Sequence, residues 1–282
     1  MPELLGMLQH GADIEVFLAW NSPRDEGLVA PHLEIFRGRR GAEAALVQEF
    51  TLDGGPFWHI SFFQPPDARD TPKVLIDTFV GTTYWNTYLL APDRQSVEML
   101  FASSDYEFAD LDRDGVYELI AWDGRLSDSS WCLALFGFAL YPRIFVRDGG
   151  GYRMAWPPLD EDAGAANFRV AAFAGLRGDG ATELLALQDR IGDGPTTQAV
   201  AIYRLEKGVF RLMAQAPLPA DRIAFPEVGI RNASGGKEIV IRTAPPMAVR
   251  TGDAVVDCNP EGPGAAKTTY ILRSDRLQQA QQ

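Results

Sequence analysis

The sequence predicts an all-β protein, a β-propeller of five blades with four antiparallel strands in each. Strand-like runs of four to eight residues, rich in Val, Ile, Phe, Tyr and Trp, alternate with turns that hold most of the 27 glycines and 19 prolines. Helical spacing of apolar residues is nearly absent, and only the short runs 42–47 and 277–282 favour a helix. A loop followed by an apolar strand also recurs along the chain, which indicates a repeat architecture.

The best-preserved copy of this repeat is a nine-residue loop from Asp110 to Glu118. Acidic residues occupy its positions 1, 3, 5 and 9, and Gly115 occupies position 6. Four carboxylates this close together repel one another unless a cation lies among them. Oxygen ligands at alternate positions around a glycine turn suit Ca²⁺, which takes about six to eight oxygens. The side chains of Asp110, Asp112, Asp114 and Glu118 are therefore predicted to bind one calcium ion.

Four weaker copies keep parts of this loop and lose most of its ligands. All five loops, the one at 110–118 included, end at an anchor residue that opens or precedes an apolar strand. The anchors recur at intervals of 45 to 65 residues: Glu15, Lys73, Glu118, Glu183 and Glu238. The copy at 175–183 keeps Asp179-Gly180 but has Arg177 at position 3. We expect Arg177 to replace the metal by pairing with Asp179 or Glu183.

Each interval leaves room for four strands, and several tight hairpins are evident, such as 199–205 with 209–214. A repeat unit of this kind cannot bury its faces alone, so we expect one domain over residues 1–282. The approximate blades are residues 1–54, 55–103, 104–160, 165–216 and 220–282. A six-bladed arrangement, with the apolar run Cys132–Phe138 in an extra sheet, stays open.

The loop and its copies resemble the FG-GAP/VCBS repeats, the blades of integrin-α-like β-propellers. In that family an Asp-x-Asp-x-Asp-Gly-x-x-Asp/Glu loop joins the first and second strands of a blade and holds Ca²⁺. The resemblance implies that Asp110, Asp112, Asp114 and Glu118 are the side-chain ligands and that Val116 offers its backbone carbonyl. It also implies a single, structural calcium ion, because the other copies have lost the ligand set.

Charge and composition limit the partners of the protein. A net charge of −12 and a pI of about 4.7 argue against nucleic acid and against anionic lipid. The longest apolar run, Trp131–Leu140, is too short to span a bilayer, so no membrane span is expected. The weak ligand set suits millimolar calcium, and we expect an extracellular or periplasmic protein whose leader is not in this sequence. A cytoplasmic location stays open, as does pairing of Cys132 with Cys258.

No group of residues matches a known catalytic motif. His59 and Asp77, with Ser129 and Ser130, form no recognised local Ser/His/Asp signature. We therefore predict a non-catalytic binding or scaffolding module that recognises a protein or glycan partner, alone or as a subunit of a larger assembly. The alternative is a polysaccharide lyase or glycoside hydrolase on the same scaffold, because the fold alone does not decide the function.

The tryptophans supply the candidate ligand-binding residues, because sugar rings stack on indole rings. Trp20, Trp85 and Trp122 follow the second predicted strand of their units and are the candidates. The other three tryptophans, Trp58, Trp131 and Trp156, are expected to pack between blades.

Overall fold

The computed structural model describes residues 4–23, 29–64, 72–80, 85–91, 93–103, 105–122, 142–149, 151–157, 166–190, 197–219, 223–233, 236–244, 266–273 and 276–280. Over these ranges the chain forms twenty β-strands and no helix, so the prediction of an all-β protein is confirmed. Consequently, no helix in the described ranges is long and apolar enough to cross a membrane. Residues 129–138, with Trp131 and Cys132, lie outside the described residues, as does Cys258.

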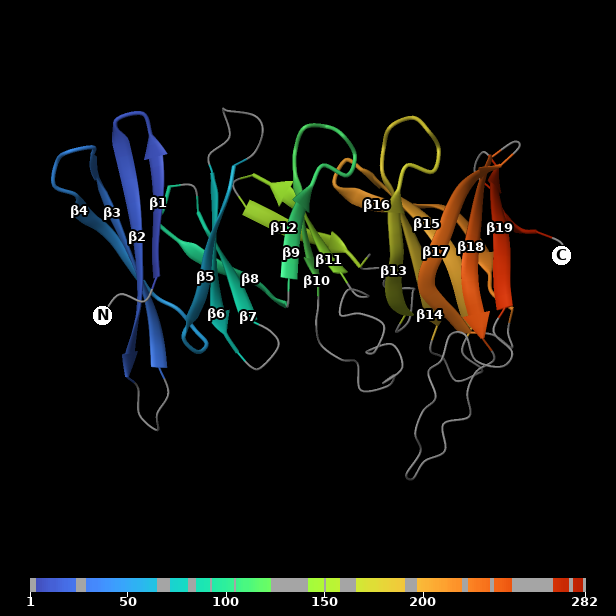
Figure 1. Cartoon of the computed structure of the whole chain (residues 1–282), viewed down its shortest axis with the longest axis horizontal. Coiled ribbons are helices and arrows are strands. Elements are labelled where there is room, and N and C mark those ends of the chain that lie inside the picture. The colour runs from blue at the N-terminus through green and yellow to red at the C-terminus, as the bar shows by residue number, and fades with distance from the viewer. Residues whose placement is uncertain are drawn as a thin grey trace, which may run out of the picture. The chain divides into compact units, whose positions relative to one another are not determined.

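The strands form five four-stranded antiparallel sheets, each built from four consecutive strands in chain order (Figure 1). The first sheet contains β1 (Leu4–His10), β2 (Asp13–Pro23), β3 (Val29–Arg39) and β4 (Ala45–Thr51). The second contains β5 (Phe57–Phe63), β6 (Lys73–Phe79), β7 (Trp85–Leu90) and β8 (Val97–Ser103). The third contains β9 (Asp105–Ala109), β10 (Glu118–Trp122), β11 (Pro142–Asp148) and β12 (Gly151–Trp156). The fourth contains β13 (Ala166–Ala174), β14 (Glu183–Arg190), β15 (Thr197–Glu206) and β16 (Val209–Pro217). The fifth contains β17 (Ile223–Ala233), β18 (Gly236–Ala244), β19 (Ala266–Arg273) and β20 (Arg276–Gln279).

The chain divides into two compact units. Unit 1 comprises Met1–Asp105 and Asp148–Tyr152, and unit 2 comprises Tyr106–Arg147 and Arg153–Gln282. Five sheets of four antiparallel strands are consistent with a five-bladed propeller. The expectation of one domain over residues 1–282 stays a prediction.

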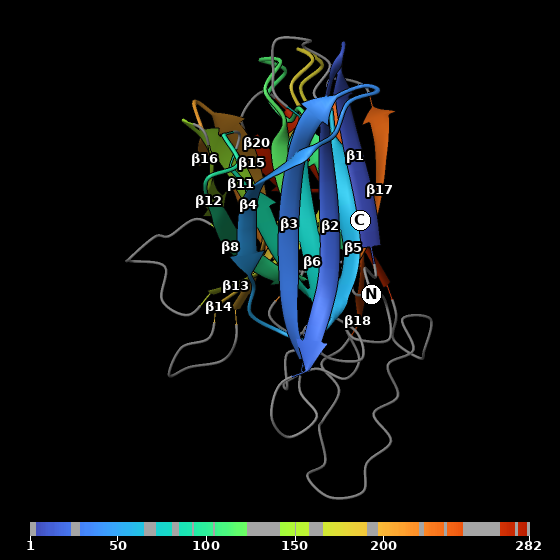
Figure 2. The same ribbon diagram turned by 90° about the vertical axis from the view of Figure 1, so that its left-hand side faces the viewer.

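Unit 1 has a core between the first and second sheets. Alternate residues of β2 and β3 turn to this core, as the two-residue period of a strand requires. Phe17 and Leu33 are fully buried there, whereas their neighbours Leu18 and Glu34 on the other face are half-buried. Figure 2 shows β2 and β3 side by side in the first sheet.

Unit 2 has two cores that share the strand β14. Leu184 faces a core made with the third sheet, and the next residue, Leu185, faces a core made with the fifth sheet. A strand buried on both faces must be apolar throughout, which explains the continuous apolar run of this strand. Trp156 is fully buried in the first of these cores, against Tyr203 and Phe210, as expected for a packing residue.

The expectation that Trp58 packs in the interior is wrong, because its side chain is 55% exposed. The cause is a β-bulge in β5. Phe57 pairs with Thr78 and His59 pairs with Asp77, so Trp58 is the extra residue of the bulge. Bulges redirect side chains in this way, and alternation along the strand cannot show them in advance.

Candidate metal centre

The loop between β9 and β10 is organised by its own carboxylates. Asp110 Oδ2 accepts a hydrogen bond from the Gly115 N–H at 3.1 Å, and Asp114 Oδ1 accepts one from the Val116 N–H at 2.7 Å. Gly115 has a φ of 85°, which an L side chain rarely adopts, so the turn requires a glycine at this position. The loop therefore forms a cup in which several carboxylates each use one oxygen to hold the backbone.

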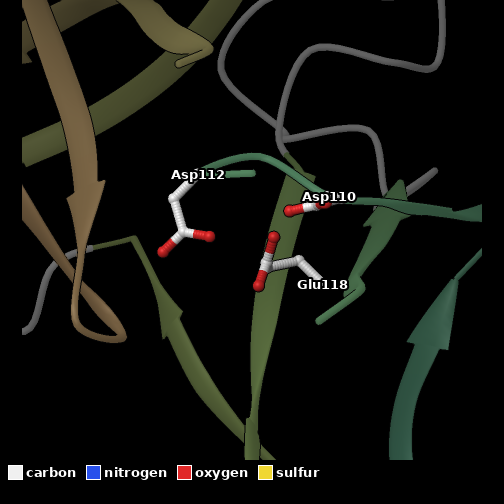
Figure 3. Close-up of side chains that lie close together, drawn as sticks. All are labelled: Asp110, Asp112 and Glu118. Atoms are coloured by element: carbon white, nitrogen blue, oxygen red, sulfur yellow. The ribbon is translucent and has the colours of Figure 1, made fainter. Parts of the chain in front are cut away.

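Three of the predicted ligands come together in this cup. Oxygens of Asp110, Asp112 and Glu118 all lie within 4.8 Å of one another (Figure 3). Asp110 Oδ1 is buried and has no hydrogen-bond partner among the described residues. Asp114 is not part of this group of three carboxylates. Val116, two residues further along the loop, is half-buried. The arrangement thus offers three convergent carboxylates, with one buried oxygen whose bonding capacity is unused.

The electrostatics of the cup favour a positive charge. Burial, followed by the charges of Asp112, Asp114 and Asp110, raises the pKa of Glu118 to about 8, even though a 2.8 Å hydrogen bond from the Leu111 N–H acts to lower it. Burial, followed by the charge of Asp114, also raises the pKa of Asp112. Both shifts indicate a site where negative charge is poorly compensated by the protein itself.

The corresponding loop of the fourth sheet has the same frame and a different cation. Glu183 Oε2 accepts a 2.7 Å hydrogen bond from the Leu176 N–H, seven residues earlier, as Glu118 does from Leu111. Its other oxygen accepts a hydrogen bond from the guanidinium of Arg204, which also bonds Asp179 at 2.7 Å. An internal ion pair is therefore present in this loop, and its cation is Arg204 on β15, which was not among the predicted residues. Pairing of Arg177 with either acid stays a prediction.

Cross-strand register explains where the arginine comes from. Arg204 lies directly opposite Glu183 in the pairing of β14 with β15, as Arg37 lies opposite Glu15 in the pairing of β2 with β3. In the third sheet Leu119 pairs with Phe145, and the next step of that register places Val146 opposite Glu118. Val146 is buried and carries no charge.

The remaining sheets also supply a cation at the anchor position. Glu238 pairs with Arg231, which lies opposite it on β17, through two hydrogen bonds of 2.7 and 2.8 Å. Glu15 binds Arg37 at 2.8 Å and the buried Arg94 at 3.1 Å. The second sheet has Lys73 itself as its anchor. Within the described part of the chain, no lysine or arginine pairs with Glu118, which leaves the third sheet as the exception.

The candidate tryptophans belong to three different sheets. Trp20 stacks on His32 with ring centroids 4.1 Å apart, and its indole N–H donates to Glu34 at 3.1 Å. Trp122 lies edge-on to Phe173 at 6.2 Å. Both rings have their polar or apolar contacts within the fold, which favours a packing role for them. Trp85 stacks instead on the exposed ring of Trp58, at 6.1 Å.

Two histidines have serine and acidic neighbours, but neither forms a catalytic relay. Ser61 Oγ and Asp77 Oδ2 approach the same nitrogen of His59, Nδ1, at 2.9 and 3.8 Å, whereas a relay uses both ring nitrogens. At His32, Ser22 Oγ is 2.8 Å from Nε2, and the Thr51 hydroxyl is 3.2 Å from Nδ1. The carboxylate of Glu49 is 4.0 Å from that nitrogen, beyond hydrogen-bond distance.

No protein-family model matches the chain, and a search of curated proteins finds no significant match.

Proposed function

We propose that the protein is a non-catalytic binding or scaffolding module, a five-bladed β-propeller that recognises a protein or glycan partner. One structural Ca²⁺ in the Asp110–Glu118 loop stabilises it, in an extracellular or periplasmic compartment where calcium is abundant. A single observation carries the metal assignment. Glu15, Glu183 and Glu238 each have an arginine partner, whereas Glu118 faces Val146 in a loop with three further acids.

The donor set fits calcium. Hard carboxylate oxygens with no nitrogen or sulfur ligand suit Ca²⁺ or Mg²⁺. A site with several carboxylates favours Ca²⁺, because Mg²⁺ keeps several waters and is usually held by only one or two carboxylates. Asp110, Asp112 and Glu118 would hold it, with Asp114 and the carbonyl of Val116 as further oxygens. The bound ion would neutralise the cup and join the first strand of the sheet to the second, as Arg204 does in the fourth sheet by pairing with two acids of its loop.

Calcium dependence of stability tests this proposal. Thermal unfolding is followed in about 10 mM CaCl₂, about 100 times a Kd at the tight end of the extracellular class, and in EGTA. The proteins compared are the wild type, Asp110→Asn and the control Asp13→Asn, an exposed acid of the first sheet. At about 100 times Kd, calcium adds about 2.7 kcal/mol to the free energy of unfolding. That corresponds to a rise in Tm of about 5–10 °C for a chain of this size. Asp110→Asn should lose the rise and Asp13→Asn should keep it.

Equal unfolding midpoints with and without EGTA, together with no calcium in a metal assay, would refute the site.

The closed propeller is tested by a separate measurement. A closed ring of this length predicts a radius of gyration of about 19 Å by small-angle X-ray scattering. A markedly larger radius would contradict a closed propeller.

A further inference from the structure

Three aromatic rings gather at one end of the second sheet. They belong to the neighbouring strands β5, β6 and β7, which Figure 1 labels. Trp58 stacks on Trp85 with ring centroids 6.1 Å apart and an angle of 20° between the planes. Phe79 lies 5.8 Å from Trp58, and it is the residue opposite Trp85 in the pairing of β6 with β7. We call these three residues the aromatic platform.

The bulge in β5 exposes this platform. Regular alternation would place Trp58 and His59 on opposite faces of the sheet. Because Trp58 is the extra residue of the bulge, it reaches Phe79 while His59 reaches Asp77, two positions that share a face of β6. The bulge therefore presents an indole ring and an imidazole ring side by side, with 55% of Trp58 and 60% of the His59 side chain exposed.

Polar groups beside the platform are held in fixed positions. The Ser61 hydroxyl lies 2.9 Å from His59 Nδ1, and Asp77 Oδ2 lies 3.8 Å from the same nitrogen. Asp77 is itself buried and accepts a 2.7 Å hydrogen bond from Thr87. The Nε1 of Trp85 is buried and has no hydrogen-bond partner among the described residues. An exposed indole ring thus adjoins a positioned imidazole, which is the combination of apolar and polar groups that small-molecule sites use for affinity and orientation.

We propose that the aromatic platform binds a neutral sugar ring of a glycan. The C–H face of the sugar would stack on Trp58, and the exposed imidazole of His59 would hydrogen-bond a sugar hydroxyl. A net charge of −12 disfavours an anionic polysaccharide. Three rings bordered by polar groups are also much smaller than the ~800 Å² that a stable protein interface covers on each partner. The inference rests on the proposed binding function and specifies its ligand class.

The test uses the full chain, fluorescently labelled and in calcium, on an array of neutral oligosaccharides of hexoses and pentoses. The variants are Trp58→Ala, Trp58→Phe and the control Met99→Ala, which truncates a side chain that is 53% exposed in the same sheet. We expect the wild type to bind at least one oligosaccharide. Trp58→Ala should weaken that binding by about tenfold or more, Trp58→Phe should weaken it less, and Met99→Ala should leave it unchanged. Unfolding midpoints confirm that the variants are folded, because Trp58 makes little contribution to the core.

Two results would overturn the inference, and both are distinguishable from failure of the proposed function. If no neutral glycan binds while calcium still stabilises the chain, the glycan assignment fails and a protein partner remains. If a glycan binds equally well to Trp58→Ala, the chain is still a binding module and its site lies elsewhere.

Discussion

Replacing Arg204 with methionine tests whether this guanidinium does in the fourth sheet what calcium is proposed to do in the third. The variant removes the cation opposite Glu183, whose side chain is fully buried, while the side chain of Arg204 itself is 13% exposed. An uncompensated buried charge left in this way costs about 3–5 kcal/mol. The second partner, Asp179, is about half exposed and adds little to this cost.

The matched control is Arg231→Met in the fifth sheet. Arg231 makes the same kind of two-bond pair with Glu238, but its side chain is 70% exposed and solvent screens the pair, so its loss should change the free energy of unfolding far less. Urea unfolding at fixed calcium measures both free energies. For a chain of this size the Arg204 variant should also lower Tm by about 6 °C or more.

If the two variants lost equal amounts of unfolding free energy, the reasoning would be refuted, because burial of the carboxylate would then not determine the size of the loss. The double variant Arg204→Met with Glu183→Leu sharpens the comparison. Removing both partners of a buried pair is often far less costly than removing one, so this variant should be more stable than Arg204→Met alone. A double variant that is less stable still would show that the loss comes from packing.

Three further outcomes are expected. Gly115→Ala places a side chain at a φ of 85°, which should cost about 1 kcal/mol or more in urea unfolding and weaken calcium binding in a calorimetric titration. Trp156→Ala empties a fully buried site against Tyr203 and should destabilise unit 2 by about 3–5 kcal/mol, measured by the urea midpoint. The hydrogen bonds from Arg231 hold the pKa of Glu238 below its usual value of 4.5. The pair therefore stabilises the fold above pH 4.5, and this contribution is lost as the pH falls through the lower pKa of the folded state. In Arg231→Ala, carboxyl NMR should show the titration midpoint of Glu238 return to its usual value.

The five sheets could be predicted because local signals repeat. Each second strand carries an apolar run directly after its anchor residue, and Lys73, Glu118 and Glu183 are the first residues of their strands. The tight hairpin at 206–209 was visible for the same reason, since Lys207 and Gly208 adopt the positive φ that its turn needs. Signals of this kind depend on residues that are close together in the sequence, so the sequence alone is sufficient to show them.

The cation of the fourth sheet could not be located from local sequence. Arg204 meets Glu183 through the register of β14 with β15, and register is a property of the assembled sheet. The exposure of Trp58 could not be predicted for a related reason. A one-residue bulge changes the face on which a side chain lies, and the residues 57–63 read as an ordinary alternating strand. In the loop between β9 and β10, the spacing in the sequence correctly predicted that Asp110, Asp112 and Glu118 lie close together, because a nine-residue loop leaves them few alternatives.

Leu111 donates its N–H to Glu118, and Leu176 donates its N–H to Glu183 in the same way. In each case the two oxygens of the glutamate have different roles. One oxygen fixes the path of the loop, and the other needs only to meet positive charge, whatever its source. Under the proposal, a built-in guanidinium and a dissolved ion are two ways to meet the same glutamate oxygen. The exchange involves two places in the sheet, since the third strand decides whether an arginine faces the glutamate and the loop decides whether further carboxylates surround it. As the sheets diverge, each can therefore gain or lose dependence on dissolved ions separately.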